Sequence, residues 1–211
     1  AQVQPLPVHP GLRPVASRLA GGALVRLSSA LWRGGREWPD ILGLAVRLRS
    51  EEAVTAVPSP GDQDLLFATL RFPWTLGLAP LSTDTYDWLE NDYYAVSPFE
   101  VEGLGRASLR ITSSRAAAPE GNSRVERLES ARRAGQARFV LEVRPSRGES
   151  AGTWLALAEL RLVEPVALDE ARLRFYPYRT GRGIQPVGFI HALRIITYRQ
   201  GQAARAAETS S

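Results

Sequence analysis

The chain has 211 residues, of which 44% are hydrophobic and 23% are charged. At about 150 residues per domain, this length predicts a single domain, and the composition is that of a globular chain with a substantial core. No apolar run approaches the roughly 18 residues that cross a bilayer, so we expect no transmembrane segment. The sequence contains no Cys and 2 His, which excludes disulfides, thiolate catalysis and Cys-ligated metals and disfavours a multi-histidine metal centre.

Arginine supplies all of the basic charge. The chain carries 26 basic and 22 acidic residues and no Lys, which excludes Schiff-base chemistry and a P-loop lysine. The pI of about 9.9 is compatible with a nucleic-acid partner, but the Arg residues are interleaved with acids along the whole chain, and we expect no such partner. The chain opens on Ala1 rather than Met, which is compatible with a removed signal peptide; we expect a cytoplasmic location.

Residues 1–20 contain Pro5, Pro7, Pro10 and Pro14, which predicts an extended N-terminal arm. Apolar residues then alternate in seven stretches, which predict strands. The predicted strands are 23–28, 41–49, 64–70, 94–102, 106–112, 137–144 and 154–163.

Helices are expected in fewer places. The stretch 81–91 predicts a short helix capped by Ser82 or Thr83, and 113–135 predicts a long loop or an exposed helix. Residues 175–186 are rich in Pro, Gly and aromatics and read as a loop, whereas 187–205 shows helical spacing. Several strands followed by one terminal helix predict an α+β fold built on an antiparallel β-barrel.

Few side chains suggest chemistry. The histidines are His9 in the arm and His191 in the predicted terminal helix. Tyr198 follows Arg194 by four residues on that helix, so the two side chains share a face. A guanidinium beside a phenol favours the phenolate, a possible metal ligand, although a packing contact explains the same spacing.

The spacing around Tyr198 resembles the proximal segment of the haem catalases. That family places Phe-x-Pro, then Pro-Gly-Ile-x-Pro, then Arg-x-x-x-Tyr, and its tyrosine is the axial iron ligand. Here the corresponding residues are Phe175–Pro177, Gly183–Pro186 and Arg194–Tyr198. Arg205 stands where the family has an arginine on a haem propionate, but the family's other arginine is Ala203.

Two earlier blocks are similar to the same family. Arg26-Leu-Ser28 looks like its Arg-Phe-Ser strand, whose arginine contacts a propionate and whose serine supports the distal histidine. Residues 40–47 and 64–65 resemble the next two motifs in order. The family's distal asparagine falls on Ala68, and His9 is the candidate for its distal histidine.

The resemblance implies a catalase-like barrel with an N-terminal arm (1–20), a barrel core (21–165), and a proximal loop with a C-terminal helix (166–211). It implies a haem b cofactor with Tyr198 as the iron ligand, and Arg26, Arg194 and Arg205 as further haem-binding residues. His9 and Ser28 would be the catalytic pair.

Three functions remain open from the sequence. The first is a haem-dependent peroxidase acting on hydrogen peroxide or organic hydroperoxides, with weak catalase activity. The second is a non-catalytic barrel that binds haem or another hydrophobic ligand. The third is a basic barrel that contacts anionic partners without a cofactor. The sequence also leaves a homo-oligomer open.

Overall fold

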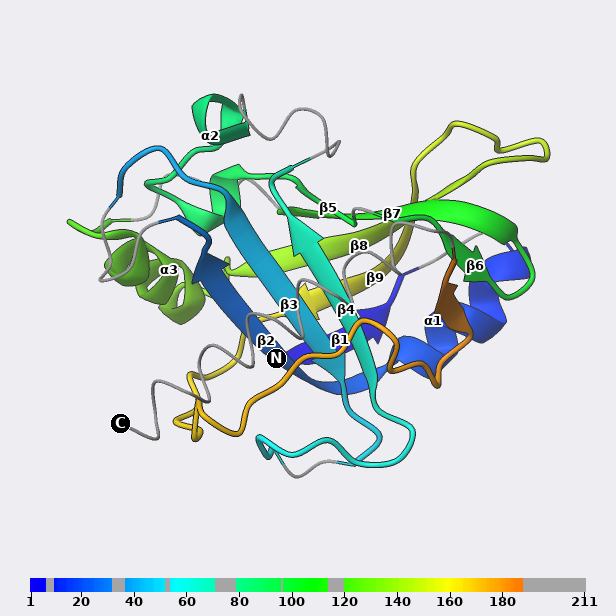
Figure 1. Cartoon of the computed structure of the whole chain (residues 1–211), viewed down its shortest axis with the longest axis horizontal. Helices are drawn as coiled ribbons and strands as arrows, with labels where there is room; N and C mark the ends of the chain where they lie inside the picture. Colours follow the sequence, from blue (N-terminus) through cyan, green and yellow to red (C-terminus); the bar gives the residue numbers. More distant parts are fainter. Residues whose placement is uncertain are drawn as a thin grey trace, which may run out of the picture.

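Eight antiparallel strands close into a barrel in the computed structural model (Figure 1). The structure describes residues 1–6, 10–31, 37–51, 54–70, 79–95, 97–113 and 120–187. Around the barrel the order is β7 (Gly105–Ser113), β5 (Tyr93–Tyr94), β4 (Gln63–Ala68), β3 (Leu42–Leu48), β2 (Gly21–Ser29), β1 (Gln2–Pro5), β9 (Leu155–Arg161) and β8 (Arg138–Pro145). Strand β8, the last in this order, also pairs with β7, which closes the barrel.

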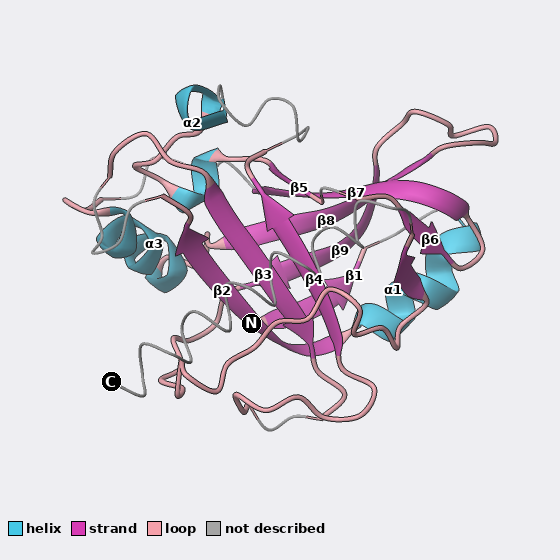
Figure 2. Cartoon of the chain, viewed as in Figure 1, coloured by secondary structure: helices cyan, strands magenta, loops and turns pink. Residues whose placement is uncertain are grey.

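Two short strands and three helices complete the described fold (Figure 2). Strand β6 (Phe99–Val101) pairs with the start of β7, and β10 (Ile184–Pro186) pairs with β6. The helices are α1 (Arg13–Leu19), α2 (Ala79–Ser82) and α3 (Arg124–Arg133), with 3-10 turns at Pro10–Leu12 and Trp88–Glu90. None of the described helices is long and apolar enough to cross a membrane.

Apolar side chains at alternate positions of the strands fill the barrel interior. In β3, Leu42, Leu44, Val46 and Leu48 are almost completely buried in the main core, whereas the residues between them face outward. A fully buried side chain of this size contributes about 1.5–3 kcal/mol relative to an exposed one. The interior is therefore a packed hydrophobic core.

The strand predictions are confirmed, with one division. The predicted strand 94–102 is two short strands, β5 and β6. The predicted helix at 81–91 is wrong over most of its length: Leu81 and Ser82 end α2, and beyond them only Trp88–Glu90 forms a 3-10 turn, capped by the Asp87 carboxylate. The carboxylate of Asp84 accepts the backbone N–H of Tyr86 at 2.8 Å, and such local hydrogen bonds compete with helix formation.

The N-terminal segment differs from the extended arm that we expected. Strand β1 is part of the barrel wall, paired with β9 along its whole length and with β2 at Gly21 and Gly22. Further along, Pro14 lies in the first turn of α1, where a missing N–H leaves no helical hydrogen bond unmade. Pro5 ends β1, and Pro10 and Pro14 lie at the starts of the 3-10 turn and of α1, so these three prolines mark element ends. The C-terminal helix predicted at 187–205 lies beyond the described residues except for Val187.

Candidate functional site

The outward side chains of β2, β3 and β4 form one continuous surface, which we call the β2–β4 outer face. Strand register aligns Ser28 with Gly43 and Ala68 in one row. The next row is Arg26, Ala45 and Leu66. The three sequence blocks that resemble the catalase motifs are therefore neighbours in the sheet.

The row of Ser28, Gly43 and Ala68 on this face is built from small side chains. Ser28 is exposed and Arg26 is half-buried. A Cβ atom at Gly43 would lie 2.8 Å from the Ser28 hydroxyl oxygen, so a larger residue there would require Ser28 to move. Within the described residues no carboxylate pairs with Arg26.

The part of the same face around Leu24, Arg47 and Asp64 is covered by residues 168–187, which we call the covering segment. Leu173 and Phe175 are buried against Leu24 of β2, in a small cluster separate from the main core. Ala45 and Leu66 pack against this cluster. The Phe175–Pro177 motif thus lies on the same side of the barrel as Arg26 and Ser28.

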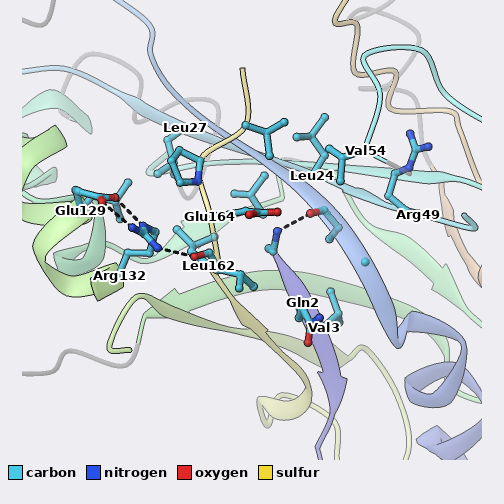
Figure 3. Close-up of a pocket in the computed structure, with 18 of the residues that line it drawn as sticks. Gln2, Val3, Leu24, Leu27, Arg49, Val54, Glu129, Arg132, Leu162 and Glu164 are labelled. Atoms are coloured by element: carbon cyan, nitrogen blue, oxygen red, sulfur yellow. Dashed lines mark hydrogen bonds and ion pairs between the residues drawn. The ribbon is translucent and has the colours of Figure 1, made fainter. Parts of the chain in front are cut away.

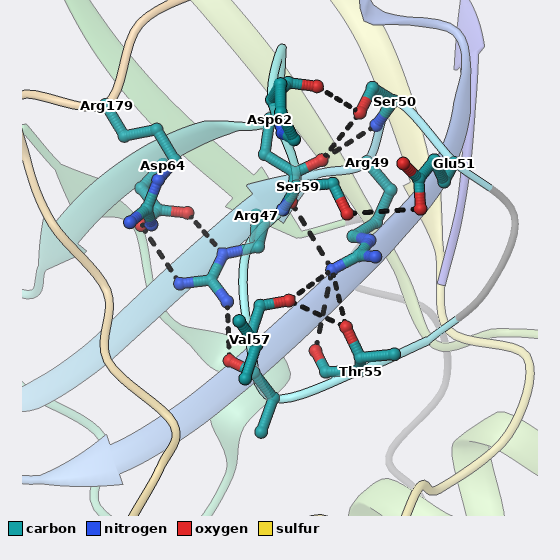
Figure 4. A network of polar contacts seen from close by, with 12 residues as sticks. Arg47, Arg49, Ser50, Glu51, Thr55, Val57, Ser59, Asp62, Asp64 and Arg179 are labelled. Carbon is teal, nitrogen blue, oxygen red and sulfur yellow. Dashed lines mark hydrogen bonds and ion pairs between the residues drawn. The ribbon is translucent and has the colours of Figure 1, made fainter.

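A buried ion pair holds the covering segment on the barrel (Figure 4). Arg47 of β3 donates from Nε to Asp64 Oδ1 at 2.8 Å and from Nη2 to Oδ2 at 3.1 Å, and both side chains are 0% exposed. The guanidinium lies 4.9 Å from the centre of the Phe175 ring. Its remaining donors reach the carbonyls of Ala56, at 3.0 Å, and Arg174.

The carboxylate of Asp64 completes this attachment. Its Oδ2 atom accepts the backbone N–H of Tyr176 at 2.7 Å and a hydrogen bond from Arg179. The backbone N–H of Asp64 donates to the carbonyl of Arg179 at 3.1 Å. Charge-assisted hydrogen bonds of this kind are about twice as strong as neutral ones, so Asp64 fixes the position of the covering segment.

A second buried ion pair, between Arg49 and Asp62, lies next to the first on the same face. Arg49 is 3.3 Å from Asp62, with side chains 1% and 0% exposed. Burial raises the pKa of the Asp62 carboxyl, but N–H donors from Ser50 and Ser59, the Ser50 hydroxyl and Arg49 outweigh burial and lower that pKa below its ordinary value. Asp62 is therefore ionised at neutral pH.

Beyond the two pairs, Gln63 and Arg182 join the barrel to the end of the covering segment. Gln63 donates from its side-chain amide to the Ile184 carbonyl at 2.6 Å and accepts the Arg182 N–H at 3.0 Å. Arg182 donates to the carbonyls of Arg18 and Arg49. Burial lowers the pKa of Arg182.

Of the predicted site residues, only Arg26 and Ser28 fall within the described part of the chain. His9, Arg194, Tyr198 and Arg205 lie outside it, as does His191. Phe67 of β4 faces the barrel interior and not this outer face. Its side chain is buried in the main core, on the opposite side of β4 from Leu66 and Ala68.

Sequence reasoning assigned no role to Arg47, Asp64 or Arg179. The available signal was a charged residue in the middle of an otherwise apolar strand, at Arg47 in β3 and Asp64 in β4. Such residues are almost never buried unless paired, so each one predicts a partner. The alternation did not indicate which residue that partner is.

Comparison with family models, curated proteins and solved structures finds no match. Among the described residues, no three His, Cys, Asp or Glu side chains gather as a set that could hold a metal ion. The candidate site is therefore defined by geometry and by the sequence resemblance.

Proposed function

We propose that the protein binds haem on the β2–β4 outer face. The observation that carries the proposal is the juxtaposition of the catalase-like blocks: Arg26 and Ser28, the β3–β4 motifs and the Phe175–Pro177 motif share one side of the barrel. These blocks are separated by up to about 150 positions in the chain, so their meeting on one face is not dictated by local sequence.

The described residues fit this cofactor in two respects. Gly43, Ala45 and Ala68 present little side-chain bulk beside Ser28, and a flat macrocycle needs such a surface. Arg26 offers a half-buried guanidinium without a carboxylate partner among the described residues, and the planar guanidinium suits a haem propionate. In the proposal Tyr198 is the iron ligand, and Arg205 holds the second propionate.

The proposed chemistry is peroxidase turnover, in which a hydroperoxide is reduced to an alcohol and water by two electrons from a small organic donor, and bound haem would supply the redox centre. His9 would take the proton from the attacking hydroperoxide and return it to the leaving oxygen. Ser28 would orient the His9 imidazole by a hydrogen bond. Arg194 would keep the Tyr198 phenol ionised by charge attraction.

A specific observation favours the second candidate, a non-catalytic haem-binding barrel. Ala68 stands in the same row as Ser28, at the position that corresponds to the family's distal asparagine, and an alanine methyl donates no hydrogen bond to a bound peroxide. The two candidates share Tyr198 and Arg26 and differ in whether His9 has a role.

The test is a haemin titration followed by absorption, with Tyr198→Phe and Arg26→Leu beside the wild type. Arg106, an exposed arginine of β7, gives the matched control Arg106→Leu. We expect a sharp Soret band with high-spin ferric features that Tyr198→Phe abolishes. Arg26→Leu should weaken haemin binding about tenfold, since a hydrogen bond to a charged group contributes about 1.5–3 kcal/mol, and Arg106→Leu should not.

Identical broad spectra for the wild type and Tyr198→Phe would overturn the proposal. With haem binding established, the His9→Ala variant separates the two candidates. Loss of hydroperoxide turnover in this variant with an unchanged Soret band supports the peroxidase. No turnover in the wild type supports the non-catalytic barrel.

A further inference from the structure

We propose that the outward surface of the covering segment binds single-stranded nucleic acid. The surface comprises Arg172, Arg174, Tyr176 and Tyr178, which we call the Arg–Tyr strip. The covering segment that carries it lies across β3 and β4 (Figure 1). None of the four residues belongs to the haem site proposed above, so the inference goes beyond that function and does not depend on it.

Residues 171–187 depart from the charge pattern of the chain as a whole. Arginines and acids are interleaved along the sequence, which was the ground for expecting no nucleic-acid partner. Residues 171–187 instead contain four Arg and no Asp or Glu, with Phe175, Tyr176 and Tyr178 among them. Arginines interleaved with aromatic residues are typical of surfaces that hold the backbone of a single strand and stack on its bases.

Alternating burial brings the Arg and Tyr side chains to the outside of the molecule. Leu173 and Phe175 are buried in the small cluster against β2. Their neighbours Arg172 and Arg174 are exposed, and Tyr176 is 44% exposed. The side chains that anchor the segment are therefore separate from those that are open to a partner.

A tight turn sets the two tyrosine rings beside each other. The Arg179 N–H donates to the Tyr176 carbonyl at 2.9 Å, and Pro177 takes the second position of this turn, where proline is favoured. The ring centres of Tyr176 and Tyr178 are 5.7 Å apart, with planes inclined by 56°. Asp64 holds both ends of the turn by accepting the Tyr176 N–H at 2.7 Å and a hydrogen bond from Arg179 (Figure 4). Because the turn is already fixed, stacking of a base on Tyr176 costs little ordering entropy.

The positive charge of the strip is not balanced by its surroundings. Among the described residues no carboxylate forms an ion pair with Arg172 or Arg174, and Arg174 donates to two backbone carbonyls at 3.4 Å. Beneath the strip, Arg47 and Arg179 share the single carboxylate of Asp64, which leaves one positive charge in excess. The local charge therefore favours an anionic partner.

The exposed arginines of α3 show the opposite arrangement. Glu129 accepts two hydrogen bonds of 2.6 Å from Arg132 (Figure 3) and one of 3.0 Å from Arg133. Of the two acids that precede the strip, Asp169 uses its Oδ1 atom to accept the Ala171 N–H at 2.9 Å. The anion for α3 is thus part of the protein, whereas the anion for the strip is supplied by the partner.

The two kinds of side chain together select a single strand. A duplex offers phosphates but keeps its bases stacked on one another, and an acidic peptide offers carboxylates but no base to stack on a ring. Unpaired nucleotides offer both phosphates and free base faces. Phosphates would lie against Arg172 and Arg174, because the guanidinium fork suits phosphate oxygens, and a base would stack on Tyr176.

The test is fluorescence anisotropy of a labelled oligothymidylate of about 20 nucleotides, which is longer than a usual site of about 4–16 nucleotides. The full chain is titrated against it at several NaCl concentrations. The variants are the double change Arg172→Ala with Arg174→Ala, and the single changes Tyr176→Ala and Tyr176→Phe. Each alters an exposed side chain and leaves the backbone contacts of the covering segment in place, and urea unfolding verifies each fold.

Two matched controls remove the same side chains elsewhere. Arg133→Ala with Arg147→Ala deletes two exposed arginines outside the strip, and Tyr86→Ala deletes a 62% exposed tyrosine. Tyr198→Phe separates this surface from the proposed haem site. All three should bind the oligonucleotide as the wild type does.

We expect saturable binding by the wild type. The double arginine variant should bind about tenfold more weakly, and the slope of log K against log salt should become shallower by about 1.4, since each phosphate contact of a single strand contributes about 0.7. Tyr176→Ala should weaken binding about tenfold with an unchanged salt slope. Tyr176→Phe should bind as the wild type does, because the ring that stacks is kept.

Absence of saturable binding, or equal weakening by the control variants, would overturn the surface. Equal affinity for a duplex of the same length would overturn the preference for a single strand. Displacement of the probe by oligoglutamate as readily as by unlabelled oligothymidylate would show that the partner is an acidic polypeptide, and would overturn the class of partner.

Discussion

Removing one member of the buried Arg47–Asp64 pair should destabilise the fold by an amount that depends on which member is lost. Asp64→Asn leaves the Arg47 guanidinium with the carbonyls of Ala56 and Arg174 and the Phe175 ring, and with no anion. Arg47→Met leaves the Asp64 carboxylate with the Tyr176 N–H and Arg179. The first change therefore leaves the less compensated charge.

Breaking a buried ion pair costs about 3–5 kcal/mol. We assign the upper end of that range to Asp64→Asn and the lower end to Arg47→Met. A chain of this size loses roughly 2–4 °C in Tm per kcal/mol, so Asp64→Asn should lower Tm by roughly 10–20 °C and Arg47→Met by roughly 6–12 °C. Arg179→Met should cost about 1 kcal/mol or less, because its side chain is 25% exposed and solvent screens the pair.

Urea unfolding followed by tryptophan fluorescence measures all three variants. The order Asp64→Asn, Arg47→Met, Arg179→Met, from most to least destabilised, checks the assignment. Equal losses for Asp64→Asn and Arg179→Met, or a wild-type midpoint for Asp64→Asn, would refute the reasoning that burial makes this pair the attachment of the covering segment.

Three further outcomes follow from single contacts. Gly103→Ala should cost about 2–3 kcal/mol, because Gly103 has φ +78° and an added Cβ would lie 2.7 Å from the Gly11 carbonyl oxygen. Gly148→Ala, with φ +89° and open space around it, should cost about 1–2 kcal/mol in the same urea assay, and equal losses would show that the close contact is relieved. Folding lowers the pKa of Asp62 from 3.8, so the stabilisation that this carboxylate contributes is complete above the unfolded pKa and is lost as pH falls through the folded pKa. Asp62→Asn should therefore flatten the fall of the urea midpoint below about pH 4. An unchanged pH profile would contradict the lowered pKa. Ser123 caps α3 by accepting the Glu126 N–H at 3.2 Å, so Ser123→Ala should cost about 1 kcal/mol and Ser123→Asp should be nearly neutral by thermal melting.

Much of the barrel could be predicted because strand alternation is a local property. In β3 and β8 the apolar residues fall on every second position, and each of these strands was expected within a few residues of its observed bounds. The break between β5 and β6 was missed, because the apolar pattern continues through residues 95–98, of which the described ones (95, 97 and 98) belong to no strand. The helix expected at 81–91 failed because side chains of Asp84, Asp87 and Asn91 bind the backbone there.

The candidate site could be predicted only in part from the sequence. Arg26 and Ser28 were identified from the resemblance, and the strand register places them on one face with Gly43 and Ala68. The role of Arg47 could not be predicted from the sequence, since a side chain at an outward position of a strand normally faces water. Its burial depends on Phe175 and Arg174, and the latter lies 127 positions away in the chain.

The sequence by itself determined the β-rich class of the fold, the inward face of each long strand, and the absence of cysteine and lysine chemistry. These properties follow from composition and from the two-residue period of a strand. The tertiary structure decided that residues 2–5 close the barrel and that Arg47 and Asp64 are buried. Each of these depends on segments far apart in the chain, whose pairing is set by closure of the barrel and by the packing of the covering segment rather than by local residue preference.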